Sequence, residues 1–179
     1  MTWLGRLTRA LTWALFGATL TSYLLIVLWS LPLISADAAG LTPFDVRPFG
    51  YDLDAARVFL AALGEAGHAQ YIGPQALLDR VFPPLLAVFS LLAFWQLYSR
   101  KWAVVLGALA LVVCWLDLQE NVAVADLLTL GAEGIDEEVV SIAALLTMLK
   151  SAVSTVTQSA LLFGAGRALW RQHKTAGNA

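Results

Sequence analysis

The sequence predicts an all-α polytopic membrane protein: a bundle of four transmembrane helices with an extra amphipathic helix in its first outer loop. Of its 179 residues, 59% are apolar or aromatic and only 13% are charged, about half the charged fraction of a soluble domain. Four segments are apolar enough, and at about 20 residues long enough, to cross a bilayer. The basic and acidic residues also fall mainly on opposite sides of the predicted membrane. Residues 1–179 are therefore expected to form a single membrane domain.

Each predicted span is a nearly unbroken apolar run, and Gly73-Pro74 signals a helix start shortly before the second run. A signal peptide is the alternative interpretation of the first run, because Ala36-Asp37-Ala38 resembles a cleavage site. The run is, however, longer than the usual apolar region of a signal peptide. We therefore expect it to be a membrane span. The four expected spans cover residues 11–34, 77–99, 102–128 and 139–169.

Charge asymmetry predicts the direction of the chain. With a cytoplasmic amino terminus, three basic residues fall outside, and the inner side holds a larger set, namely Arg6, Arg9, Arg100, Lys101, Arg167, Arg171 and Lys174. Nearly all acidic residues then lie outside, and none lies inside. This distribution follows the positive-inside rule. It predicts a multi-pass membrane protein with both termini in the cytoplasm.

The loop after the first span is too long to be structureless in a compact domain. Asp52 is a good N-cap, and Leu53, Ala56, Leu60 and Leu63 share one helical face. We therefore expect an outer cap helix over residues 52–64. In the second outer loop, Asp136 and its acidic neighbours are expected to cap the fourth helix rather than bind a cation, because acids in a first turn complement the helix dipole.

Ionisable residues within the spans are the strongest functional signal, because charges are costly inside a bilayer. Asp117, Glu120 and Asn121 are spaced to share one face of the third helix. Lys150 lies on the fourth helix, about 25 Å above the inner boundary at 1.5 Å per residue, and Asp117 lies at a similar depth. The two helices are consecutive and antiparallel. We therefore expect Lys150 to pair with Asp117 or Glu120 near the outer face.

The role of this polar cluster is left open between a structural lock and a ligand site. Its members are Asp117, Glu120, Asn121, Lys150, Ser151, Ser154 and Gln158. Serine and threonine are common at helix interfaces in membranes, which favours the lock. Polar groups converging beneath an outer cap favour a pocket for a lipid-like or small polar ligand. No catalytic residue is assigned, and the weak candidates for acid–base chemistry are Asp117 and Glu120.

Several classes of function are excluded or disfavoured. The basic residues are too few and scattered for nucleic-acid binding. Cys114 is the only cysteine, which excludes an internal disulfide and dithiol chemistry. The histidines lie outside the spans, so the sequence does not indicate haem. No phosphate-binding or zinc-protease motif is present, and no cofactor or metal is expected.

Two groups of residues resemble a pattern in small bacterial integral membrane proteins. They are Tyr51-Asp52 with Ala56-Arg57-Val58-Phe59-Leu60 and Leu63-Gly64, and the span motif Asp117-Leu-Gln-Glu-Asn121. The likeness covers roughly residues 51–121. It implies a bacterial inner membrane and four helices, and it implies no activity.

Taken together, the residues favour a non-enzymatic membrane protein that binds a lipid-like or small polar ligand, or a partner subunit, through the charged cluster. The alternative is an intramembrane lipid-modifying enzyme with Asp117 and Glu120 as acid and base. The expected partners of the chain are the lipid bilayer and, in addition, a lipid or small-molecule ligand, a partner membrane protein or a second copy of the chain. Small residues spaced by four, at Ala103 and Gly107 and at Ala160 and Gly164, allow either internal packing or self-association.

Overall fold

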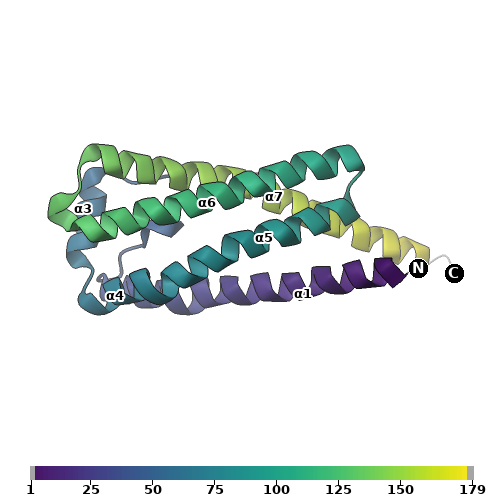
Figure 1. Ribbon diagram of the computed structural model, residues 1–179, viewed down its shortest axis with the longest axis horizontal. Coiled ribbons are helices and arrows are strands. Elements are labelled where there is room, and N and C mark those ends of the chain that lie inside the picture. Colours follow the sequence, from purple (N-terminus) through teal and green to yellow (C-terminus); the bar gives the residue numbers. More distant parts are fainter. Residues whose placement is uncertain (1–2, 177–179) are drawn as a thin grey trace.

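The computed structural model describes residues 3–176, which are almost entirely helical and contain no strand (Figure 1). Four helices are long and apolar enough to cross a membrane, at Gly5–Asp37, Glu65–Leu97, Arg100–Gly134 and Glu137–Arg171. The predicted fold class, an all-α polytopic helical bundle, is confirmed. The chain is a multi-pass membrane protein on the length and composition of these helices.

The first long helix is built from α1, a π-helical turn and α2, and the second from α4, another π-helical turn and α5. The elements in chain order are α1 (Trp3–Leu25), η1 (Ile26–Ser30), α2 (Leu31–Asp37), η2 (Phe44–Val46), α3 (Leu53–Ala62), α4 (Glu65–Gln70), η3 (Tyr71–Gln75), α5 (Ala76–Leu97), α6 (Arg100–Gly134) and α7 (Glu137–Ala176).

The second long helix begins earlier than the sequence predicted. Gly73-Pro74 does not start it, because helical structure already runs from Glu65 and continues through Pro74. Pro74 has no backbone N–H to donate, and the chain accommodates it by changing to π-helical bonding over one turn. The nearby Gln70 side chain donates to the Ser30 hydroxyl at 2.9 Å, which links this region to η1 in the first helix.

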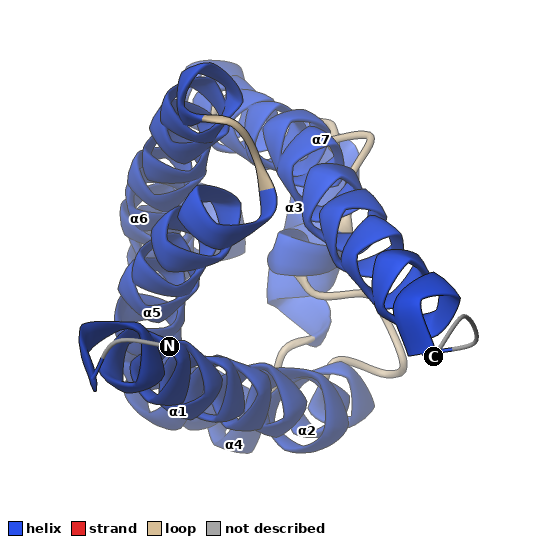
Figure 2. Ribbon diagram, turned by 90° about the vertical axis from the view of Figure 1, so that its right-hand side faces the viewer, coloured by secondary structure: helices blue, strands red, loops and turns tan. Residues whose placement is uncertain are grey.

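The long helices pack in chain order: α1 against α5, α5 against α6, and α6 against α7. Viewed along the bundle, α5 and α6 lie between α1 and α7 (Figure 2). Both chain termini lie at one end, which we call the terminal end. The opposite end carries α3 and the α6–α7 connection, and we call it the loop end (Figure 1).

At the loop end, a short apolar core holds α3 and η2 against the long helices. Phe44, Phe59 and Ile135 are almost fully buried and pack with Leu127 and Val140. The Asp52 side chain accepts a hydrogen bond from Ala55 N at 2.8 Å, so it is the N-cap that the sequence predicted for α3. Asp136 caps α7 in the same way, accepting from Val139 N at 3.0 Å.

At the terminal end, the small residues serve contacts inside the chain. A Cβ on Gly107 would lie 2.8 Å from Leu91 Cδ2, and one on Gly164 would lie 2.7 Å from Tyr98 Cε2. The Tyr98 hydroxyl also donates to the Ala160 carbonyl at 2.6 Å. Of the two uses that the sequence allowed for these residues, the structure therefore provides internal packing.

Gly67 provides a test of the close contact between α2 and α4. Its N–H donates to Asp37 Oδ2 at 2.7 Å, and an added Cβ would meet that oxygen at 2.6 Å. We expect Gly67→Ala to lower the free energy of unfolding by about 1–3 kcal/mol, because the site has no room for a methyl group. Thermal unfolding in mild detergent measures this loss.

Gly73→Ala is the matched control, because Gly73 also lies in the second long helix and has no heavy atom within 4 Å of the added Cβ. This variant should change stability by less than about 1 kcal/mol. Equal losses in the two variants would show that the α2–α4 contact does not limit stability.

Candidate functional site

An ion-pair cluster joins α6 to α7. Lys150 Nζ on α7 lies 3.4 Å from Asp117 Oδ1 and directly contacts Glu120 Oε2, both on α6. The exposed fractions of the three side chains are 15% for Lys150, 13% for Asp117 and 0% for Glu120. The pairing expected from helix spacing and depth is confirmed, and Lys150 contacts both carboxylates rather than one.

Glu120 is the most buried member of this cluster, and it also faces the loop end. Thr147 on α7 lies beside Glu120. The hydroxyl of Tyr51 also lies near Glu120, and Tyr51 belongs to the loop segment, residues 38–64, between the first and second long helices. Burial raises the pKa of the Tyr51 phenol above its usual value, and the nearby charge of Glu120 raises it further. Tyr51 therefore remains a neutral hydroxyl at physiological pH.

The loop that carries Tyr51 is fixed by Arg47. The guanidinium lies over three aromatic rings, at 5.3 Å from the ring centre of Phe44, 5.5 Å from that of Tyr51 and 5.4 Å from that of Phe59. It also donates to the Thr42 carbonyl, at 2.6 Å from Nη2. Burial lowers the pKa of Arg47, and the neighbouring Tyr51 and Tyr71 oppose this shift. These contacts hold the loop segment in place over the helix ends.

A second polar group, of which the sequence singled out only Asn121, joins η2, η3, α5 and α6. The Tyr71 hydroxyl in η3 donates to Asp45 Oδ2 in η2. Gln75 Nε2 donates to Asp79 Oδ1 at 2.7 Å, and Asn121 Nδ2 donates to the Asp79 carbonyl at 2.8 Å. Of the residues predicted for the site, Asn121 therefore joins this second group rather than the Lys150 cluster.

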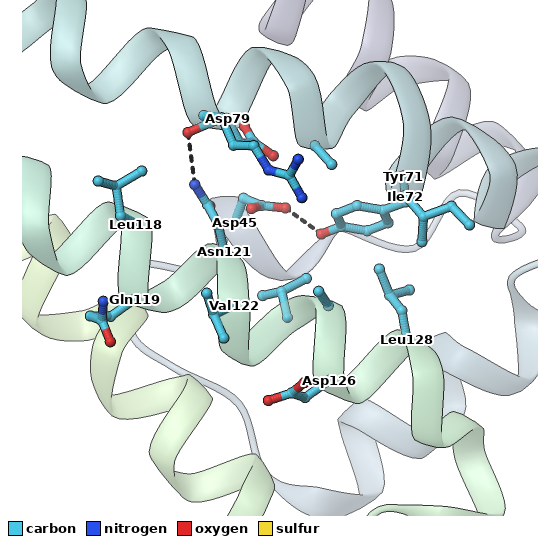
Figure 3. A pocket seen from close by; sticks show the side chains of 14 residues that line it. Asp45, Tyr71, Ile72, Asp79, Leu118, Gln119, Asn121, Val122, Asp126 and Leu128 are labelled. Atoms are coloured by element: carbon cyan, nitrogen blue, oxygen red, sulfur yellow. Dashed lines mark hydrogen bonds between the residues drawn. The ribbon is translucent and has the colours of Figure 1, made fainter.

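The second group forms one end of a cavity of about 370 Å³ between the loop-end halves of α5 and α6 (Figure 3). Asp45, Asp79 and Asn121 contribute polar groups to its lining, together with Arg80 and Asp126. The rest of the lining is mostly apolar and includes Ile72, Leu118, Val122 and Leu128. A cavity that combines apolar walls with a few polar groups is typical of a ligand site.

Asp45 connects the cavity to the ion-pair cluster electrostatically. Its carboxylate acts on Asp79 within the cavity, and on Glu120 and Lys150 behind it. Asp117 and Glu120, by contrast, are absent from the cavity lining. The cavity therefore lies beside the Lys150 ion pairs, and of the predicted cluster only Asn121 lines it.

None of the serine and glutamine positions predicted for the site forms a hydrogen bond with Lys150 in the described part of the chain. Ser151 and Ser154 are half-buried on α7, and their carbonyls accept hydrogen bonds from Thr155 and Thr157. Gln158 is exposed and lies one turn further along α7. Among the described residues, the Lys150 ammonium pairs with Asp117 and Glu120, and no hydrogen bond joins it to a serine, as a Ser–Lys pair would require.

Asp45, Tyr71 and Gln75 were missed because of where they lie in the sequence. Asp45 belongs to a loop with no periodic pattern, and it was grouped with the other acids of the outer side. Tyr71 and Gln75 precede the apolar run, in the π-helical turn that the Gly73-Pro74 pair conceals. The one signal in the sequence was the spacing of Gln75 and Asp79 by one helical turn.

No group of three or more His, Cys, Asp or Glu residues that could hold a metal is found within residues 3–176.

No family model, curated protein or solved structure matches this chain. Its function therefore has to follow from the chemistry of the cavity and the cluster.

The ion-pair cluster predicts a specific pattern of stability. We expect Lys150→Met to lower the free energy of unfolding by about 3–5 kcal/mol, because it leaves Glu120 buried without its cation. Adding Glu120→Gln should restore part of this loss, since the fully buried position 120 then carries no charge without a partner. Thermal or chemical unfolding in detergent measures both variants.

Lys150→Met combined with Asp117→Asn is the comparison variant. Asp117 is further from Lys150 and slightly exposed, so removing its charge should restore less stability than Glu120→Gln does. If neither second substitution restores stability, the ion pairs do not explain the loss.

Proposed function

We propose that this chain is a non-enzymatic protein of the bacterial inner membrane that binds a lipid-like or small polar ligand in its outer half. The observation that carries this proposal is the cavity of about 370 Å³ between α5 and α6, which combines the carboxylates of Asp45 and Asp79 with mostly apolar walls. The ligand site is thus the cavity beside the Lys150 cluster rather than the cluster itself.

The local backbone supports a binding role. The π-helical turn η3 supplies Tyr71 and Ile72 to the cavity lining, and Gln75 from the same turn supports Asp79. Single π-helical turns inside α-helices occur frequently at functional sites. The Lys150 ion pairs then have a structural role: they hold α6, one wall of the cavity, against α7.

The enzymatic alternative, with Asp117 and Glu120 as acid and base, has less support. Glu120 is fully buried and in contact with Lys150, and neither carboxylate lines the cavity. A general acid or base must reach the substrate within hydrogen-bonding distance or through one water molecule. A ligand in the cavity would meet Asp45 and Asp79 instead.

Filling the cavity tests the proposed function. Ala125 lines the cavity and is exposed on α6, so Ala125→Phe would occupy the space without changing a charge. Native mass spectrometry of protein gently extracted from its own membrane should show a bound small molecule on the wild type. We expect its occupancy to fall at least about tenfold in Ala125→Phe, as excluded volume removes the apolar contacts.

Ala108→Phe is the matched control, because Ala108 is also exposed on α6 but does not line the cavity, and it should keep the bound molecule. A wild-type chain without any small molecule would contradict the proposal, and so would equal occupancy in both variants. A partner protein retained by all three forms would assign the chain to a complex instead.

The proposed direction of the chain has its own test. We expect both termini in the cytoplasm, because the basic residues gather at the terminal end. A fluorescent protein that matures only in the cytoplasm should be bright when fused to the carboxyl terminus, and alkaline phosphatase fused there should be inactive. The opposite pair of results would reverse the topology and place the cavity in the inner half.

A further inference from the structure

The cavity carries an excess of negative charge. Asp45, Asp79 and Asp126 contribute three carboxylates to its lining, and Arg80 contributes the one basic side chain of the lining. Among the described residues, no basic side chain lies within ion-pair distance of Asp45 or Asp79, whereas Lys150 is occupied by Asp117 and Glu120. Within the described part of the chain, neither Arg80 nor any other basic side chain therefore forms an ion pair with Asp45 or Asp79.

The hydrogen-bond donors that reach these carboxylates are neutral. Asp45 accepts from the Tyr71 hydroxyl, and Asp79 accepts from the Gln75 amide. Neutral donors satisfy one oxygen of each group, and Lys150, whose charge acts on both carboxylates from a distance, forms its ion pairs with Asp117 and Glu120 instead. Unpaired charge in a region of low dielectric is costly. A ligand that brings positive charge would relieve this cost.

The interior beside the cavity is also short of donors. Gln75 is fully buried, and its Oε1 atom has no hydrogen-bond partner. The buried Oδ1 atom of Asn121, a residue of the cavity lining, has none either. Both atoms are acceptors, as are the carboxylate oxygens nearby. The same region thus lacks N–H donors as well as positive charge, and a primary ammonium group supplies both, with three N–H donors and one charge.

We propose that the ligand is a membrane lipid whose headgroup carries a primary ammonium, bound by the carboxylates of Asp45 and Asp79. This inference rests on the proposed function and specifies its ligand. Figure 3 shows Asp45 between Asn121 and Tyr71, with Asp79 above them. The ammonium would lie between the two carboxylates.

The position of the cavity argues for a lipid rather than a soluble amine. The cavity lies between two helices of membrane-spanning length. Two of its apolar lining residues, Ile72 and Val122, are 53% and 59% exposed, which suits contact with acyl chains. Arg80, also exposed in the lining, would pair with the lipid phosphate, and guanidinium groups bind phosphate well.

The test compares lipids that differ only in the headgroup. Purified full-length protein in mild detergent is titrated with phosphatidylethanolamine, phosphatidylcholine and phosphatidylglycerol of identical acyl chains, and binding is followed by native mass spectrometry. Phosphatidylcholine keeps the positive charge and loses every N–H donor, and phosphatidylglycerol loses both. We expect phosphatidylethanolamine to bind at least about tenfold more tightly than either, the range expected for hydrogen bonds between charged groups.

Equal affinity for the three lipids would overturn the ammonium assignment and leave the proposed function standing. No saturable binding of any lipid would overturn both. Soluble phosphoethanolamine is the remaining probe. If it binds as tightly as the intact lipid, the lipid assignment fails, because the apolar walls then contribute nothing.

Two variants test where the ammonium group of the lipid binds. Asp79→Asn should weaken phosphatidylethanolamine binding at least about tenfold and leave phosphatidylglycerol binding unchanged. Asp54→Asn is the control, because Asp54 is exposed in the first turn of α3, outside the cavity, and it should bind like the wild type. If Asp79→Asn retains the full preference for phosphatidylethanolamine, the headgroup does not bind there. The wild-type lipid comparison decides the headgroup preference even if this variant fails to fold.

Discussion

The arrangement of the loop end depends on Lys150. A lysine in the middle of a long apolar helix needs a partner, and α6 provides Glu120 and Asp117 at the matching level. This pairing sets the register of α6 against α7. Because α6 also forms one wall of the cavity, the same pairing positions Asn121, which follows Glu120 directly and donates to the Asp79 carbonyl of α5.

The second constraint is the loop segment between the first and second long helices. Arg47 over its three aromatic rings fixes this segment, and the segment carries both Tyr51 and Asp45 inward. Tyr51 lies near Glu120, whereas Asp45 lines the cavity. One ordered loop therefore supplies polar groups to two neighbouring sites, and the negative charge of Asp45 acts on both.

These two constraints separate a structural role from a binding role. The Lys150 cluster is internally paired, and its carboxylates lie outside the cavity lining. The carboxylates of the cavity, Asp45 and Asp79, have only neutral donors. Only the carboxylates of the first group are paired with a cation. We therefore assign a stabilising role to the first group and ligand binding to the second.

The sequence by itself determined the four membrane helices, although not where the second one begins, the caps at Asp52 and Asp136, and the pairing of Lys150 with Asp117 or Glu120. These features follow from local periodicity, from capping chemistry and from the cost of an unpaired charge in an apolar helix. Only the tertiary structure decided the position of the cavity, because Asp45 comes from an aperiodic loop and Tyr71 from a π-helical turn. Their meeting depends on packing between distant segments, which no local pattern encodes.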